Sequence, residues 1–353
     1  MSNETAPQTD AWRADTARPE ARGPRPRRAP STGTRRTMIR LVVALLVAVT
    51  ALVACGDDDT DPTPTETTAT TATTEATADP SAFPVTVGAD NGDITIPDEP
   101  TAIVSLSPSI TEMLYAIGAG DQVEAVDASS NHPADAPTTD LSGFRPNVEA
   151  IGALEPDLVF LARDRDDVVA TLEDVGITVV LLEAPETLDA VYAQIRLVAT
   201  ATGHVDAGVA VADEVADQIG DLLADAPDRD EPLTYFYELS TEYHTLTSDT
   251  FVGSVLTAAG MQNIADGVDP GAGSFPQLTA EFVLDADPDV ILIAHADGSA
   301  VDDAELASRP GWSELTAVVE GRVVALDPDI ASRWGPRIPE LLAAVLDATA
   351  SIG

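Results

Sequence analysis

Short apolar runs and longer amphipathic stretches alternate along the chain from residue 83 to its end. Short runs rich in Val, Ile and Leu, bounded by Gly, Pro or Asp, predict buried strands, whereas longer stretches with helical spacing predict helices. Two alternating segments, 85–87 and 94–96, flank Asn91-Gly92 and predict a β-hairpin. The regular alternation of strands and helices indicates an α/β protein.

The longest helical stretch runs from His204 to Ala226, just past the middle of the chain. Gly203 ends the helical pattern before it and Pro227 stops it, which is the usual punctuation of a helix. At 1.5 Å per residue this helix would be about 33 Å long, roughly the span of a small domain.

The segments on either side of this helix resemble each other. Residues 148–162 and 280–294 align without a gap, with a glutamate, a Pro-Asp pair and four apolar residues at matching positions. Each predicts a short helix, a turn and a buried strand. Any helix–turn–strand of an Ala-rich protein shares part of this pattern, but the match at Glu and Pro-Asp favours an internal repeat. A second match follows each copy, at 176–182 and 321–326.

The repeat and the helix predict two similar α/β lobes. We expect an N-terminal lobe over residues 83–203, a connecting helix over 204–226 and a C-terminal lobe over 227–353.

Residues 1–54 have the layout of an export signal. An apolar run of 14 residues, 41–54, follows Arg35, Arg36 and Arg40, and it is too short for a comfortable transmembrane helix. Its end, Leu-Val-Ala-Cys-Gly, resembles a bacterial lipobox, which predicts that Cys55 is lipidated. An ordinary signal with an incidental cysteine is the alternative. Export by the general or the twin-arginine route, and a true start at Met38, are left open.

Residues 55–82 begin with that cysteine and continue almost entirely in Asp, Thr, Ala, Glu and Pro. This composition offers little apolar surface to bury, so we predict a disordered tether between the lipid anchor and the lobes.

The charge of the chain is strongly acidic. All 18 basic residues are arginines, and from Cys55 onward nine arginines face 56 acidic residues, a formal charge near −47. Such a body has no basic footprint for nucleic acid and is repelled by anionic membrane surfaces. We therefore expect no nucleic-acid partner, and membrane attachment through the lipid alone. The single cysteine excludes a disulfide within the chain.

A candidate ligand-binding junction follows the predicted strand at 101–106. Ser107 leads into a helix that Gly118 ends, and Ser109 with Glu112 has the form of a capping box. A strand that feeds a helix N-terminus presents free N–H groups at the carboxyl edge of a parallel sheet, where α/β folds bind ligands. Ser107 is therefore a candidate ligand contact.

Arginine is scarce after residue 55, so its distribution is informative. Five of the nine fall in loops after predicted strands or beside the repeat: Arg145, Arg163, Arg165, Arg333 and Arg337. At such an edge of a sheet they would offer bidentate contacts to carboxylates or phosphates of a ligand. Ion pairing with neighbours such as Asp164 and Asp166 is the alternative for each.

Several segments in order resemble the substrate-binding proteins of ABC importers for iron–siderophores, cobalamin and haem. They are SLSPSITEMLYAIGAGDQVEAV, SSNHP and GFRPNVEAIGALEPDLVF in the first half, and TFVGSVLTAAGMQNIAD and FPQLTAEFVLDADPDVIL in the second. The resemblance covers residues 83–353. It implies two Rossmann-like lobes joined by one rigid helix, with the ligand held in the cleft between them.

The resemblance also implies a docking surface. In that family one surface glutamate per lobe pairs with arginines of the membrane permease, and Glu149 and Glu281 match those positions. Each also follows an N-cap candidate, Asn147 or Thr279, where a carboxylate simply favours the helix dipole.

Ligand contacts are implied in the same way. Residues that match family positions at the cleft rim, or in a loop that contacts ligand, are Phe144, Phe275, Trp334, Tyr243 and His244. Aromatic faces at such a rim cover a flat or apolar ligand. Trp312 has apolar helical neighbours and is expected in the core.

A bare metal ion is the main rival ligand. Related binders gather His and carboxylate ligands around Zn²⁺ or Mn²⁺, and His132, His244 and His295 could lie near strand ends. No two histidines have the spacing of a metal-ligand pair, which disfavours such a site. His132 remains a candidate ligand contact, and a histidine or Tyr243 could ligate haem iron.

Enzyme motifs are missing from the sequence. It contains no Gly-x-Ser-x-Gly, HExxH or P-loop, and no Gly-x-Gly-x-x-Gly follows the first strand. A sensor or adhesion lipoprotein of the same fold is a further alternative. We predict a monomeric, lipid-anchored, extracytoplasmic receptor without a resident cofactor. It would hand a metal chelate, a ferric siderophore or cobalamin, to an ABC permease through Glu149 and Glu281.

Overall fold

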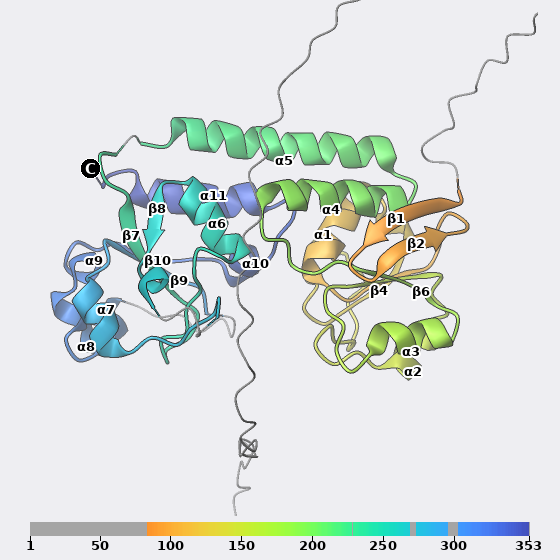
Figure 1. The fold of residues 1–353 in the computed structure, drawn as a ribbon, viewed down its shortest axis with the longest axis horizontal. Helices are drawn as coiled ribbons and strands as arrows, with labels where there is room; N and C mark the ends of the chain where they lie inside the picture. Colours follow the sequence, from red (N-terminus) through yellow and green to blue (C-terminus); the bar gives the residue numbers. More distant parts are fainter. Residues whose placement is uncertain (1–82, 228, 269–272, 296–302, 353) are drawn as a thin grey trace, which may run out of the picture. The chain divides into compact units, whose positions relative to one another are not determined.

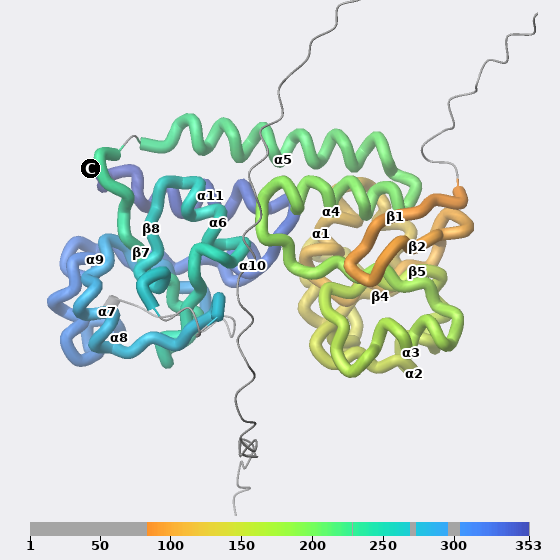
Figure 2. Tube along the Cα trace, in the orientation of Figure 1, coloured from red at the N-terminus to blue at the C-terminus, as the bar shows by residue number. Residues whose placement is uncertain are grey.

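The computed structural model describes residues 83–227, 229–268, 273–295 and 303–352 (Figures 1 and 2). Two four-stranded sheets, each flanked by helices, account for most of these residues. We call the part from β1 to α4 the N-lobe and the part from β7 to α11 the C-lobe. A single helix, α5 (Val205–Asp225), joins the two lobes.

The elements of the N-lobe follow in chain order: β1 (Val85–Ala89), β2 (Gly92–Ile96), β3 (Ile103–Ser105), α1 (Pro108–Ala116), β4 (Val123–Val126), α2 (Val148–Gly152), β5 (Leu158–Leu161), α3 (Val168–Asp174), β6 (Thr178–Leu181) and α4 (Leu188–Ala201). Those of the C-lobe are β7 (Leu233–Glu238), α6 (Phe251–Ala258), β8 (Met261–Asn263), α7 (Ala280–Ala286), β9 (Val290–Ile293), α8 (Asp303–Ser308), α9 (Thr316–Val319), β10 (Val323–Ala325), α10 (Pro328–Ser332) and α11 (Ile338–Thr349).

The predicted hairpin is confirmed as β1 and β2, which pair antiparallel around Asn91-Gly92. Asn91 also fixes the hairpin to the N-lobe sheet. Its Nδ2 donates to the Val179 carbonyl at 3.0 Å, and its Oδ1 accepts from the Leu181 amide at 3.0 Å. One turn residue therefore closes the hairpin and joins it to β6.

The N-lobe sheet is parallel, in the order β4-β3-β5-β6. Alternate residues of its strands enter two apolar clusters, as the two-residue period of a strand requires. Ile103 and Leu158 pack in the cluster that contains α1 and α4, whereas Val104 and Val159 pack in the cluster that contains α2 and α3. Burial on both faces explains why these strands are continuous apolar runs.

The C-lobe sheet has the order β8-β7-β9-β10, which matches the N-lobe sheet strand for strand. The predicted internal repeat is therefore confirmed: α2–β5 corresponds to α7–β9. The aspartate of the repeated Pro-Asp pair makes equivalent hydrogen bonds in the two lobes. Asp157 accepts from the Thr101 amide at 2.8 Å, and Asp289 accepts from the Thr234 amide at 2.9 Å, so each aspartate ties its turn to the start of the neighbouring strand.

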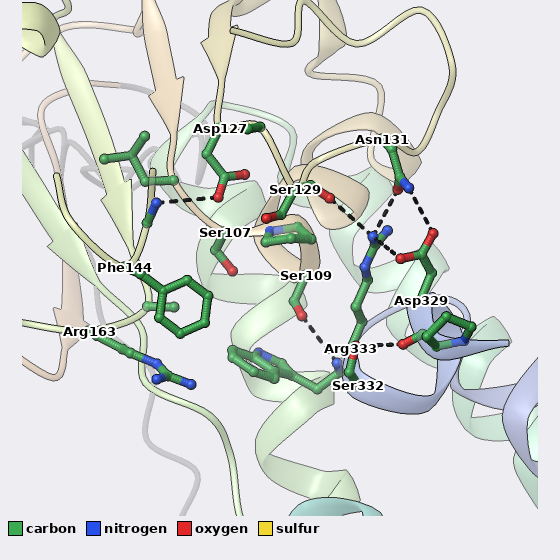
Figure 3. A pocket seen from close by; sticks show the side chains of 17 residues that line it. Ser107, Ser109, Asp127, Ser129, Asn131, Phe144, Arg163, Asp329, Ser332 and Arg333 are labelled. Carbon is green, nitrogen blue, oxygen red and sulfur yellow. Dashed lines mark hydrogen bonds and ion pairs between the residues drawn. The ribbon is translucent and has the colours of Figure 1, made fainter. Parts of the chain in front are cut away.

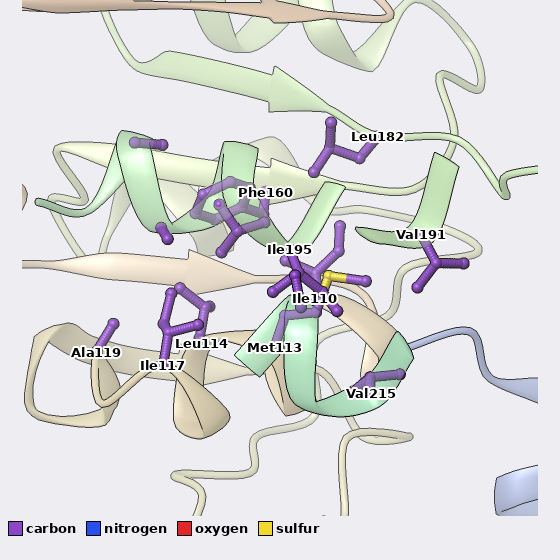
Figure 4. Packing of buried hydrophobic residues seen from close by; sticks show 14 of the residues in the cluster. Ile110, Met113, Leu114, Ile117, Ala119, Phe160, Leu182, Val191, Ile195 and Val215 are labelled. Atoms are coloured by element: carbon purple, nitrogen blue, oxygen red, sulfur yellow. The ribbon is translucent and has the colours of Figure 1, made fainter. Parts of the chain in front are cut away.

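The connecting helix α5 packs on α4 of the N-lobe and on α11 of the C-lobe (Figure 1). Ala212, Val215 and Ile219 bury its inner face in an apolar cluster that α1, α4 and α11 share. Figure 4 shows Val215 together with residues of α1 and α4 in this cluster. Gly208 permits the close approach to α4, because a Cβ there would lie 2.1 Å from the Ala199 Cβ. The helix is therefore part of a core that continues from one lobe into the other.

One local prediction is wrong. The N-cap of α1 is Ser107 and not Ser109, and its side chain makes no capping hydrogen bond. Pro108 occupies the first turn, where its missing N–H costs nothing. Glu112 does not reach back to the helix start, because its carboxylate is buried against Arg333 of the C-lobe at 2.7 Å. Gly118 has φ +85° just after the helix, and Trp312 is fully buried, both as predicted.

The predicted signal (1–54), the lipidated Cys55 and the tether (55–82) lie outside the described residues. Within the residues that are described, no helix is both long enough and apolar enough to span a bilayer.

Candidate functional site

A cavity of about 570 Å³ lies between the lobes at the carboxyl ends of β3, β4 and β5 (Figure 3). The N-lobe lines it with residues that directly follow these strands and with the loop at Gly143; the C-lobe lines it with α10 and the residues after it. The lining is Leu106, Ser107, Pro108, Ser109, Asp127, Ala128, Ser129, Asn131, Gly143, Phe144, Ala162, Arg163, Pro328, Asp329, Ser332, Arg333 and Trp334. The carboxyl edge of a parallel sheet is where α/β folds bind ligands.

Five of the predicted ligand contacts line this cavity: Ser107, Phe144, Arg163, Arg333 and Trp334. Phe144 is 59% exposed, and the Arg163 guanidinium lies over its ring at 4.9 Å. The loop after β5 and the loop before α2 thus present an aromatic face beside a cation at the cavity edge. Such a pair suits a ligand that has an apolar face and a polar rim.

Arg333 was predicted as a contact for an anionic ligand, but its guanidinium is hydrogen-bonded to protein groups. Its guanidinium is buried and donates to Glu112 at 2.7 Å, to Asp329 at 2.6 Å and to Asn131 at 2.8 Å. Glu112 and Asn131 belong to the N-lobe, so this side chain ties the lobes together. Its charge is compensated by the carboxylates of Glu112 and Asp329. Arg333 therefore forms part of the cavity wall, and its charge is not free to bind a ligand.

Trp334 is held across the same boundary. Its backbone amide donates to Ser109 Oγ at 3.1 Å and its indole Nε1 donates to Gln194 Oε1 of α4 at 3.0 Å. The ring is therefore fixed at the cavity by two bonds to the N-lobe.

Asp127 is the most buried carboxylate that faces the cavity, with 3% of the residue exposed. Ser130 Oγ donates to its Oδ1 at 2.6 Å, and the Gly143 amide approaches its Oδ2 at 3.4 Å. Burial raises the pKa of the Asp127 carboxyl, although these hydrogen bonds and the Arg333 charge act in the opposite direction. Asp127 was not among the predicted ligand contacts, yet it follows β4 directly, as Ser107 follows β3 within two residues.

Gly143 determines how closely its loop approaches these strands. A Cβ at this position would lie 2.2 Å from the Leu106 carbonyl oxygen and 3.3 Å from Asp127 Oδ2. No real contact is that short, so any side chain must push the loop away from the cavity wall.

Gly143→Ala is therefore expected to lower the free energy of unfolding by about 1–3 kcal/mol, measured by urea denaturation, and to weaken binding in the cavity. Gly152→Ala is the matched control, because a Cβ on Gly152 of α2 meets nothing within 4 Å. Equal stability of the two variants would contradict the expectation.

The other predicted contacts of the N-lobe lie outside this cavity. His132 and Arg165 are exposed. Arg145 lines a separate cavity of about 390 Å³ beside α2, together with Asp140 and Asn147.

Of the predicted aromatic contacts of the C-lobe, Trp334 lines the cavity, whereas Phe275 and Tyr243 are not among its lining residues. Phe275 is 65% exposed. Tyr243 stacks on the buried Trp312 ring, with the two ring centroids 5.8 Å apart. The Arg309 guanidinium also lies over the Trp312 ring, 4.5 Å from its centroid. Next to them Glu238, at the end of β7, accepts from Arg309 at 2.7 Å and contacts His295 at 2.9 Å. The tyrosine, the arginine and the histidine thus order the carboxyl edge of the C-lobe sheet.

Glu149 and Glu281 occupy equivalent, exposed positions in the first turns of α2 and α7. The predicted N-caps are confirmed: Asn147 accepts from the amides of Glu149 and Ala150, and Thr279 accepts from the amide of Phe282. The side chains of Asn147 and Thr279 make these caps, and Glu149 and Glu281 themselves are exposed.

The described residues contain no group of three or more His, Cys, Asp or Glu that could hold a metal ion. The cavity instead offers hydroxyl groups, carboxylates, one arginine at its edge and two aromatic rings. This set suits an organic ligand with an apolar body and polar substituents.

Comparison with known proteins agrees with this geometry. Residues 103–330 match the family described as periplasmic binding protein. The chain is 32% identical over 310 residues to an uncharacterized ABC transporter substrate-binding lipoprotein, YvrC, of Bacillus subtilis, covering 84% of this chain and 92% of that one. It is 32% identical over 275 residues to the cobalamin-binding protein of Halobacterium salinarum, covering 76% and 74% of the two chains.

Among solved structures, the periplasmic vitamin B12 binding protein BtuF of Vibrio cholerae is similar, with a TM-score of 0.58 and 27% identity over 71% of this chain and 96% of that one. The predicted α/β fold of two lobes joined by one long helix is confirmed by this likeness and by the sheet topology. The matched family consists of binding proteins, which agrees with the non-enzymatic prediction. The chain belongs to the periplasmic binding protein family and is a homologue of ABC-transporter substrate-binding lipoproteins.

Proposed function

We propose that this chain is an extracytoplasmic, lipid-anchored receptor that delivers a metal chelate to an ABC import permease. The ligand class is cobalamin or a ferric siderophore, and cobalamin is the first choice because a relative with 32% identity is named for binding it. The anchor would be Cys55, supported by its lipobox-like surroundings and by the lipoprotein named among the relatives.

The cavity between the lobes is the observation that carries this proposal. Its volume of about 570 Å³ lies within the range of small-molecule sites. Phe144 from the N-lobe and Trp334 from the C-lobe both line it, so a chelate with an apolar face would contact both lobes at once. The apolar core that continues through α5 supports a fixed position of one cavity wall relative to the other. We expect binding with little relative motion of the lobes.

Delivery would use Glu149 and Glu281. Their equivalence in the repeat places one exposed carboxylate on each lobe, so a permease with two matching arginines would recognise both lobes together. The strong negative charge of the chain supports an encounter with a basic surface.

The proposal is tested by titrating the full chain, purified from membranes in detergent, while tryptophan fluorescence is followed. The panel contains cyanocobalamin, haemin, several ferric siderophores, and free Zn²⁺ and Mn²⁺. We expect saturable quenching by one chelate at sub-micromolar concentration, because Trp334 lines the cavity. Trp334→Phe is the control, since it should remove most of the quenching signal.

Tight binding of a bare ion and of no chelate would contradict the proposal. No binding across the panel would also contradict it and would favour a sensor of the same fold.

A further inference from the structure

The cavity has an uneven charge distribution. Two of the described lining residues are arginines. Arg333 forms ion pairs with Glu112 and Asp329, and Arg163 lies at the exposed edge over the Phe144 ring. The inner wall, in contrast, carries the Asp127 carboxylate and the hydroxyl group of Ser107, both almost completely buried (Figure 3). The deep part of the cavity is thus richer in hydrogen-bond acceptors than in cations.

The protein compensates the Asp127 carboxylate only in part. A carboxylate has room for about four hydrogen bonds on its two oxygens. Here the Ser130 hydroxyl group donates one at 2.6 Å, and the Ser130 backbone amide donates another. The Gly143 amide lies farther away, at 3.4 Å. Burial still raises the pKa of this carboxyl, because removal from water disfavours its charged form. A donor group on the ligand would stabilise that charged form.

We propose that Asp127 is a specificity-determining residue, which accepts a hydrogen bond from an amide N–H of an uncharged, amide-bearing chelate and rejects ligands with a carboxylate at that place. The inference rests on the proposed function, because it assumes that a chelate occupies this cavity. The corrinoid ring, whose rim carries primary amides, has the matching chemistry; a ring that carries carboxylates there does not.

A ligand amide and a ligand carboxylate would interact with Asp127 in opposite ways. An N–H donor to a buried carboxylate makes a charge-assisted hydrogen bond, which is stronger than a neutral one. A ligand carboxylate at the same place puts two negative charges together away from water, and one of them must be protonated or displaced. One peripheral amide exchanged for a carboxylate should therefore change affinity by about ten- to hundredfold.

The test compares cyanocobalamin with its separate monocarboxylic acids, in which one peripheral amide is hydrolysed, on the full chain at neutral pH. The wild-type protein should bind cyanocobalamin about tenfold or more tightly than at least one of these acids. Asp127→Asn has nearly the same shape and no charge. It should weaken cyanocobalamin binding about tenfold and abolish or reverse the preference over that acid.

Two further variants make the result specific to this position. Glu124→Gln removes a negative charge from an exposed position of β4, the strand that precedes Asp127, and should leave all affinities unchanged. Asp127→Ser removes the carboxylate in a different way and should show the same loss of preference. Thermal unfolding of each variant identifies any that fails to fold.

Each outcome has a distinct meaning. If cyanocobalamin binds and the Asp127 variants keep the wild-type preference, the inference is wrong and the proposed function stands. If haemin or an anionic ferric siderophore binds more tightly than cyanocobalamin, the inference is again wrong, while a receptor for chelates remains. If the wild-type protein binds no chelate, both fail.

Discussion

Replacing Arg333 by alanine is expected to lower the free energy of unfolding by about 3–5 kcal/mol. The reason is that Glu112, whose side chain is 2% exposed, loses its close charged partner in the protein interior. Arg337 lies at 3.5 Å from the same carboxylate and can compensate only part of this loss. Asn131 and Asp329, which lie on different lobes, also lose the guanidinium that they share.

Urea denaturation of the purified chain measures this effect, and a double variant separates its cause. Arg333→Met combined with Glu112→Gln removes both charges, so it should recover much of the stability that Arg333→Ala loses. Arg196→Ala is the control, because Arg196 pairs with Asp213 at 2.6 Å but both side chains are largely exposed. Exposed pairs contribute about 0–1 kcal/mol. A loss for Arg333→Ala as small as that for Arg196→Ala would show that the pair between the lobes is not needed for stability.

Reversing the charge of both Glu149 and Glu281 is expected to reduce ligand import by about tenfold or more and to leave ligand affinity unchanged. Both carboxylates are exposed on short helices away from the residues that line the cavity, so a change there should not reach the bound chelate. Glu149→Arg or Glu281→Arg alone should have a smaller effect, because one carboxylate remains for the permease. Uptake of the ligand by whole cells and titration of the purified chain measure the two quantities separately.

A second double variant separates the effect of these two positions from the effect of the total charge of the protein. Asp174→Arg with Asp285→Arg adds the same four positive units at exposed positions of α3 and α7. Import that falls equally in both double variants would mean that the overall field of the protein, and not docking at two points, governs delivery. Import that is unchanged in the Glu149 and Glu281 variant would refute the docking role.

Part of the candidate site was accessible from the sequence because its residues follow strands directly. Ser107 comes after β3 and Arg163 after β5, and both line the cavity at the carboxyl edge of a parallel sheet, where α/β folds bind ligands. The rule that ligands bind at this edge, applied to β4, would have selected Asp127. Asp127 was overlooked because acids are abundant in this chain and a single one carries little information.

Other parts of the site depend on contacts between distant residues. Arg333 and Glu112 are 221 positions apart, and nothing local to either indicates that they form a buried pair. Tyr243 and Phe275 were placed near the ligand by resemblance, but the first stacks on Trp312 and the second is exposed outside the cavity.

The sequence by itself determined the lobes, the repeat and the connecting helix. Apolar periodicity, the Pro-Asp turns and the punctuation at Gly203 and Pro227 are local signals, and each acts within a few residues of the element that it specifies. Only the tertiary structure decided which charges are free to meet a ligand. The compensation of Arg333 and the partial compensation of Asp127 depend on which groups the fold brings within 4 Å, and an interior of low polarity makes those few neighbours decisive.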